Sequence, residues 1–132
     1  MTEQITAERA LELLEHVVAK HGRDTKRGCV YVTWEDNELV PWCIVGCVFA
    51  EVGVPLSRLE GCGSNVYSLW ESGSLSDVVD LSYGVASILR AAQRVQDMNE
   101  TWGRALAEAR RRAWALGVHG KNSPPAVTPV LP

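Results

Sequence analysis

Apolar residues near the start of the chain recur at the spacing of an α-helix. Thr6 is a favourable N-cap residue, and Gly22 suits the position just after a helix end. The pattern predicts an amphipathic helix over 7–21. Its apolar stripe consists of Ala7, Ala10, Leu11, Leu14, Val17 and Val18.

The next segment has the alternating pattern of a β-strand. The run CVYVTW at 29–34 is rich in aromatic and β-branched residues, and a polar turn at 35–38 follows it. Leu39 and Val40 begin a returning strand that Pro41 ends, which predicts a short β-hairpin over 29–41.

Residues 42–52 are apolar on nearly every side, and Glu51 is the only charged residue among them. A helix of this kind is buried on most faces, which predicts the central helix of the core, with Pro41 well placed at its start. Gly46 lies in its middle, where glycine costs roughly 1 kcal/mol relative to alanine. We therefore expect another element, either the hairpin or a second helix, to pass close to Gly46.

Residues 55–81 have a weaker pattern. It fits a helical turn at 55–61, a loop at 62–65 and a short helix at 66–73. The rest of this segment, up to Leu81, is predicted to be a connection.

Two further amphipathic helices are predicted over 82–98 and 101–117, with Ser82 and Thr101 as their N-caps. Four of the six prolines fall in 118–132, which has no periodicity and is predicted to be an extended tail. The inner faces of the two helices consist of Val85, Ile88, Leu89, Ala92 and Val95 in the first and Trp102, Ala105, Leu106, Ala109 and Ala113 in the second.

Together these elements predict an α+β fold, a single mainly helical domain over 1–117 with about four main helices around one short β-hairpin. The 132 residues are 46% hydrophobic and 22% charged, as in soluble globular proteins. No apolar run reaches the roughly 18 residues of a membrane span, and the acidic start of the chain does not resemble a secretory signal. We expect a cytoplasmic protein that does not enter a membrane.

The cysteines bear on metal binding and catalysis. Thiols stay free in a reducing cytoplasm, and the spacing of these four matches no zinc finger or ribbon, because those sites use closely paired ligands. We expect small buried side chains and no metal or cofactor. The alternatives are a reactive thiol, or a metal site that starts from two cysteines four residues apart and is completed by another cysteine or a histidine. The cysteines are Cys29, Cys43, Cys47 and Cys62.

A thiol enzyme would use Cys43, because the first turn of a helix lowers a thiol pKa and supplies N–H groups for an oxyanion. The candidate general bases are His16, His21 and His119. The apolar neighbours of Cys43 argue in the opposite direction, since an apolar setting raises the thiol pKa. We therefore predict no catalytic residue and a buried, unreactive Cys43.

Charge is unevenly divided along the chain, whose net charge is −3. Residues 1–80 carry six basic and thirteen acidic residues, a net charge of −7, whereas 81–132 carry seven and three, a net charge of +4. The two C-terminal helices resemble a helix-turn-helix in outline. The length of the first and the alanines of the second favour packing over base recognition, so nucleic-acid binding is the weaker hypothesis. The candidates for phosphate contacts are Arg104, Arg110, Arg111 and Arg112.

A protein-binding module is the favoured interpretation, because the chain has five tryptophans but one phenylalanine. Tryptophan and arginine are the residue types of interface hot spots. Trp114 lies off the inner face of its helix and is the predicted anchor for a protein partner or a homodimer; in the alternative it folds back onto Leu116. The predicted surface consists of Trp114, Trp102, Arg104, Arg110, Arg111 and Arg112.

Several short motifs form a recognisable combination. They are Cys29-Val30-Tyr31 in the strand, Cys43-Ile44-Val45-Gly46 at a helix start, the corner Val52-Gly53-Val54-Pro55-Leu56, Ala91-Ala92-Gln93-Arg94-Val95-Gln96-Asp97, and Thr101-Trp102-Gly103-Arg104-Ala105-Leu106. The combination, over residues 7–113, resembles a group of small uncharacterised proteins of actinobacteria and their bacteriophages, although Trp42 stands where such proteins often have a serine. The resemblance implies a cytoplasmic, phage-encoded protein whose partner is a protein of a bacterial host. It assigns no site residue.

Overall fold

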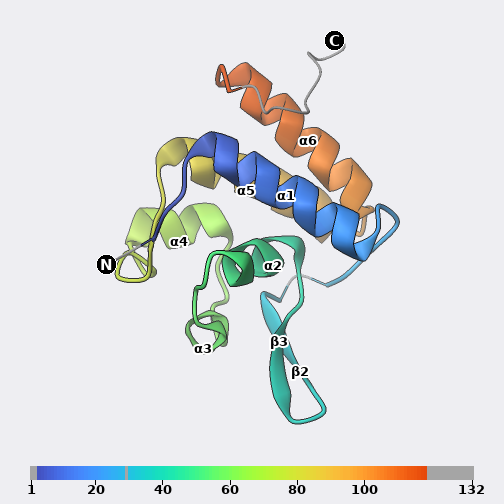
Figure 1. The fold of residues 1–132 in the computed structure, drawn as a ribbon, viewed down its shortest axis with the longest axis vertical. Helices are drawn as coiled ribbons and strands as arrows, with labels where there is room; N and C mark the ends of the chain where they lie inside the picture. Colours follow the sequence, from blue (N-terminus) through green and yellow to red (C-terminus); the bar gives the residue numbers. More distant parts are fainter. Residues whose placement is uncertain (1–2, 29, 119–132) are drawn as a thin grey trace.

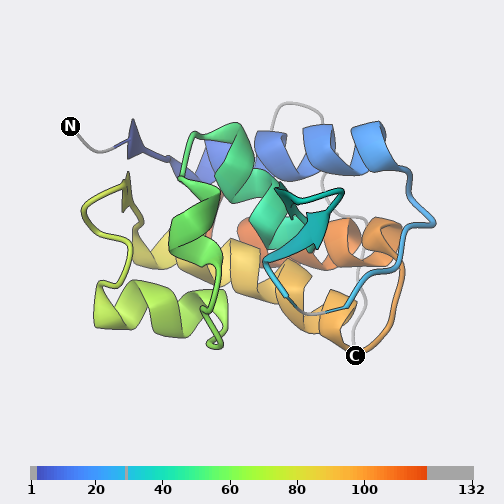
Figure 2. The same ribbon diagram turned by 90° about the horizontal axis from the view of Figure 1, so that it is seen from below.

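The computed structural model describes residues 3–28 and 30–118. Three long helices, α1 (Ala7–His21), α5 (Tyr83–Asp97) and α6 (Trp102–Ala115), pack against one another (Figure 1). The shorter α2 (Ile44–Glu51) lies between α1 and α5 when the molecule is seen from below (Figure 2). With one antiparallel hairpin beside these helices, the predicted α+β, mainly helical fold is confirmed.

Short elements complete the fold. The hairpin consists of β2 (Val32–Glu35) and β3 (Glu38–Pro41), and a second small sheet pairs β1 (Glu3–Gln4) in parallel with β4 (Val79–Asp80). The helical turn and short helix predicted in the weakly patterned segment are α3 (Leu56–Leu59) and α4 (Val66–Ser72). None of the described helices is long and apolar enough to cross a bilayer.

Polar caps place the helix starts. The side chain of Thr6 accepts a hydrogen bond from the N–H of Arg9 at the start of α1, and Ser82 and Thr101 begin α5 and α6 in the same way. Each cap satisfies one of the N–H groups that a helix start leaves without a partner. The three predicted N-caps are therefore confirmed.

Helix α2 is the core helix, because every residue from Ile44 to Phe49 is buried. Gly46 is needed there, since a Cβ at this position would overlap the backbone carbonyl of Tyr31 in the segment that leads into β2. The expected close neighbour of Gly46 is thus the base of the hairpin. The helix begins at Ile44 with Cys43 as its N-cap, and Pro41 is the last residue of β3 rather than the start of the helix.

The hairpin extends away from the helices at the end of the molecule opposite α6 (Figure 1). Its turn residues Asp36 and Asn37 both have positive φ, 51° and 65°, as a two-residue type I′ turn requires. Because both residue types tolerate this backbone conformation, the polar turn fixes the register of the two strands. Glu35 pairs with Glu38 and Trp34 with Leu39.

The structure differs from the sequence expectation at one strand boundary and in one strand pair. Strand β2 begins at Val32 instead of residue 29, and Cys29 lies outside the described residues. The β1–β4 pair was not predicted, because two-residue strands have no readable period and pair only through tertiary contact. Of the predicted tail, only Val118 lies within the described residues.

Gly46→Ala should lower the free energy of unfolding by about 1–3 kcal/mol, because the added methyl group displaces the Tyr31 carbonyl and outweighs the better helix propensity of alanine. Gly28→Ala is the matched control, since nothing lies within 4 Å of a Cβ built there. Urea titration of both variants measures the difference. Equal stability of Gly46→Ala and wild type would contradict the close approach.

Candidate functional site

The predicted tryptophan–arginine surface on α6 does not form one face. Trp102 is 0% exposed, so its place on an interaction surface is wrong, whereas its predicted place on the inner face of the helix is confirmed. The ring centres of Trp102 and His21 lie 5.4 Å apart in a T-shaped arrangement, and Nε1 of Trp102 has no hydrogen-bond partner among the described residues. Trp114, at 39% exposure, does reach the surface, and its role as an anchor stays a prediction.

Two of the predicted arginines brace α6 against other helices. The guanidinium of Arg110 donates to Glu15 of α1, with Nη2 and Oε2 3.1 Å apart. That of Arg112 donates to the hydroxyls of Ser87 and Tyr83 in α5, at 2.6 and 3.1 Å. Both guanidinium groups therefore bind other helices of the same molecule. These intramolecular bonds give the two arginines a structural role that needs no external partner.

The other two predicted arginines are exposed but paired on their own helix or just before it. Arg104 lies 3.6 Å from Glu100, and Arg111 lies 2.9 Å from Glu108. These four residues, with the exposed Met98, line a shallow hollow of mixed charge. A phosphate backbone is bound by uncompensated positive charge, so this arrangement weighs against the nucleic-acid hypothesis.

Cys43 is buried, as predicted, at 1% exposure. Its sulfur accepts the N–H of Gly46 at 3.3 Å, so the thiol serves as the N-cap of α2. Burial raises the pKa of the Cys43 thiol to about 12, and this effect exceeds the opposing hydrogen bonds from the helix start. A thiol in this state is a poor nucleophile at neutral pH.

The histidine that lies near a thiol is His21, and the thiol is Cys47, with Nε2 and Sγ 3.9 Å apart. Burial raises the pKa of Cys47 to about 11, while burial and then the charge of Arg27 lower the pKa of His21. Both groups are neutral at pH 7, which is the opposite of the thiolate–imidazolium pair of a cysteine enzyme. His16 lies 3.6 Å from Glu51, and His119 is outside the described residues.

No group of three or more histidine, cysteine or acidic side chains within residues 3–28 and 30–118 is arranged to hold a metal ion. Arg27 occupies the space beside His21 instead. Its guanidinium lies 4.4 Å from the ring centre of Trp42 and 5.2 Å from that of Trp102, and it donates to the Trp42 carbonyl. These contacts join the loop after α1 to the starts of α2 and α6.

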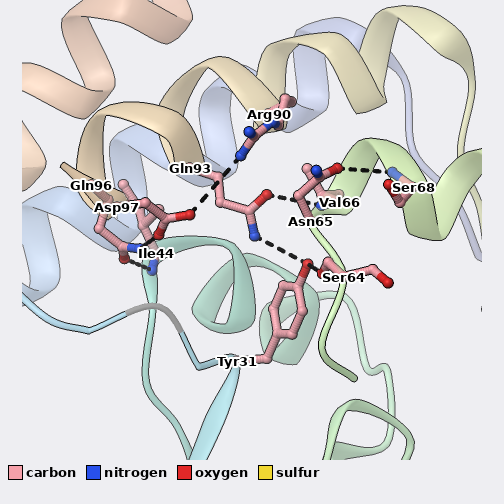
Figure 3. Close-up of polar contacts among 10 residues, drawn as sticks. All are labelled: Tyr31, Ile44, Ser64, Asn65, Val66, Ser68, Arg90, Gln93, Gln96 and Asp97. Atoms are coloured by element: carbon pink, nitrogen blue, oxygen red, sulfur yellow. Dashed lines mark hydrogen bonds and ion pairs between the residues drawn. The ribbon is translucent and has the colours of Figure 1, made fainter. Parts of the chain in front are cut away.

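Two buried glutamines of α5 form the main polar cluster of the core (Figure 3). The Oε1 atom of Gln96 accepts the N–H of Ile44, and that of Gln93 accepts the N–H of Val66, both at 2.8 Å. Ile44 and Val66 are the first residues of α2 and α4. One face of α5 therefore supplies hydrogen-bond acceptors for the first N–H groups of two other helices.

The same cluster fixes the base of the hairpin. The amide nitrogen of Gln93 donates to the hydroxyl of Tyr31 at 3.0 Å, and that hydroxyl donates to the carbonyl of Ser64 at 2.7 Å (Figure 3). Burial raises the pKa of Tyr31, so the hydroxyl keeps its proton. These bonds hold Tyr31, the residue directly before β2, beside the loop before α4.

Between the hairpin and residues 59–62 lies a groove of about 370 Å³. Two large apolar side chains on the hairpin side are exposed, Trp34 at 58% and Val30 at 52%, while Leu59 at the end of α3 is buried. The indole N–H of Trp34 donates to Glu60 at 2.8 Å and so bridges the groove. The groove is lined by residues 30–34, Leu39 and residues 59–62.

The groove is not evident from the sequence. The pattern predicts a strand for Val30 and Trp34, and nothing in the pattern of 55–61 places Leu59 beside them. The one sequence feature that points to the groove is a tryptophan directly before an acidic turn. An aromatic residue near the tip of a hairpin lies too far from the helices to pack in their core. The Tyr31–Ser64 and Trp34–Glu60 hydrogen bonds join residues 33 and 26 positions apart in the chain, which no local pattern contains.

Comparison with protein-family models finds no matching family, and searches of curated proteins and of solved structures find no match. The resemblance to small proteins of actinobacteria and their bacteriophages stays a prediction.

Cys43 should resist thiol-directed labelling in the native protein at neutral pH, because it is buried and its pKa is raised to about 12. Peptide mapping by mass spectrometry after a short exposure to iodoacetamide measures this. The half-buried Cys62 is the internal reference and should be modified first. Fast labelling of Cys43 without denaturant would restore the enzyme hypothesis.

Gln96→Met should lower the free energy of unfolding by about 1–3 kcal/mol, because it keeps the volume but leaves the buried N–H of Ile44 without an acceptor. Gln4→Met, at an exposed position of β1, is the matched control. Thermal and urea unfolding measure both variants. If the two substitutions have equal effects, the glutamine does not stabilise the start of α2.

Proposed function

We propose that this protein is a protein-binding module with no catalytic step, and that its docking surface is the groove between the hairpin and residues 59–62. The observation that carries this proposal is Trp34, which is 58% exposed on a hairpin that extends from the helical body. Tryptophan is among the residue types enriched in interface hot spots.

The chemistry of the buried groups supports a binding role over catalysis. Cys43 and Cys47 are neutral thiols, and His21 is a neutral imidazole beside the second of them. None of these supplies a nucleophile or a charged acid at neutral pH. The resemblance to actinobacterial and phage proteins supports a protein of a bacterial host as the partner.

The groove is also better placed than the α6 surface that the sequence suggested. The arginines of α6 are engaged by Glu15, Glu108, Ser87 and other groups of the chain, and Trp102 is buried. The lining of the groove combines an exposed tryptophan, Trp34, with an exposed valine, Val30. Trp114 remains the single exposed tryptophan described on α6 and provides the comparison for a test.

Trp34→Ala should abolish capture of the partner while the fold stays intact, because it removes the aromatic side chain at the rim of the groove. Trp114→Ala is the matched control, since it removes an exposed tryptophan from α6. The measurement is quantitative mass spectrometry of the proteins that each immobilised variant retains from actinobacterial lysate, with a thermal melt of each variant.

A partner that is lost with Trp34→Ala and kept with Trp114→Ala supports the groove. The reverse result places the binding surface on α6, as the sequence suggested. Loss with neither variant contradicts a tryptophan-anchored binding module.

A further inference from the structure

We propose that the groove binds an extended, basic peptide segment of its partner, which adds as a third strand along the outer edge of β2. This inference rests on the proposed function and specifies its ligand. Three observations carry it: an open strand edge, the groove that adjoins β2, and uncompensated negative charge around both.

The register of the hairpin leaves the outer edge of β2 open. In a hairpin closed by a two-residue turn, Glu35 and Glu38 form the first hydrogen-bonded pair, and the pairs then alternate along the ladder. Val32 and Trp34 therefore direct their N–H and C=O groups away from β3. Trp42 donates to the carbonyl of Tyr31 at 2.9 Å, which continues the same alternation. Within the described residues, no backbone partner for those outward groups exists.

The opposite edge of the hairpin is blocked. Pro41 lies at the β3 position that faces outward, and proline has no N–H to donate. Helix α3 also packs against β3. Of the two hairpin edges, that of β2 is therefore the more accessible to an added strand, because unpaired strand edges are the sites where extended peptides add.

The groove adjoins β2, since residues 30–34 line it without interruption. Side chains of an added strand would alternate between the two faces of the enlarged sheet. Val32, Trp34 and Leu39 share one face, because directly paired residues of an antiparallel ladder lie on the same side. Every second side chain of the peptide would then enter the groove beside Trp34, which favours apolar residues at those positions.

Negative charge around the edge favours a basic peptide. Among the described residues, no ion pair includes any of the four carboxylates at the hairpin tip and beside Trp34. The nearest basic residues along the chain are engaged elsewhere, Arg27 between two tryptophans and Arg58 with Asp77 at 2.7 Å. The same charge opposes a second copy of this edge as the occupant. The carboxylates are those of Glu35, Asp36, Glu38 and Glu60.

The first test uses the full chain as bait for a display library of short random peptides. We expect enriched sequences to alternate apolar residues with lysine or arginine. A synthetic copy of an enriched peptide should bind more weakly as salt concentration rises. Methylation of every second backbone nitrogen, in the set that faces β2, should weaken it by about tenfold or more, while methylation of the other set should have little effect.

The second test changes the protein. Val32→Pro removes an N–H from the outer edge but none from the β2–β3 ladder, and should weaken the peptide by about tenfold or more; Val32→Ala, which keeps the N–H, is the matched control. Hydrogen exchange at the N–H groups of Val32 and Trp34 should slow when the peptide binds. If Val32→Pro does not fold, the methylated peptides and the exchange rates on wild type decide the question.

The outcomes separate this inference from the proposed function. Peptides that need Trp34 but tolerate backbone methylation would keep the groove as a docking surface and overturn strand addition. Failure to enrich any peptide, or enrichment of acidic peptides, would also overturn it. Sedimentation of the free protein provides the last check: a dimer that Val32→Pro dissociates would assign the edge to a second copy and not to a basic peptide.

Discussion

The structure depends on the two glutamine oxygens that α5 presents to the core. Each accepts the first N–H of another helix, Gln96 from Ile44 in α2 and Gln93 from Val66 in α4. A helix start buried in an apolar core loses the hydration of its N–H groups. Without a hydrogen-bond acceptor in the protein, this loss would destabilise the fold. The two glutamines are three residues apart on one helix face, so a single rigid element sets the origin of two others. Because the amide of Gln93 continues to Tyr31, the base of the hairpin is set by the same helix.

The hairpin is consequently anchored at its base and open at its tip. At the base, Gly46 allows the backbone of Tyr31 to touch α2, and the Tyr31 hydroxyl bonds the loop before α4. At the tip, Glu35 faces Glu38 across the ladder, and a like-charge pair directly opposite is destabilising. A two-stranded hairpin is marginal by itself, so the base must supply the stability that the tip does not. Because the stabilising contacts lie at the base, the tip can carry carboxylates and the exposed indole of Trp34.

Local chemistry made the helices and the hairpin predictable, whereas long-range contacts decided the rest. Thr6, Ser82 and Thr101 are caps in any context, and Asp36-Asn37 suits a type I′ turn. The glutamines carried a readable signal, because Gln93 and Gln96 each lie four residues after a member of the apolar stripe of α5. The periodicity alone could not tell which groups they would meet. The sequence predicts Trp102 both on an inner helix face and on an interaction surface. Its packing against His21 and the loop after α1 places it on the inner face.

The uneven charge along the sequence suggests attraction between molecules, whereas in the folded molecule some of the opposite charges pair with each other. A net charge of −7 in one segment and +4 in the other suggested attraction between molecules. In the fold, part of that attraction is used within one molecule, since Arg110 of α6 pairs with Glu15 of α1 at 3.1 Å. The acidic groups near Trp34 have no such partner among the described residues, because the hairpin extends beyond the reach of α6. Unpaired negative charge therefore lies beside the open edge of β2, and a ligand that satisfies both the charge and the edge needs basic side chains on an extended backbone.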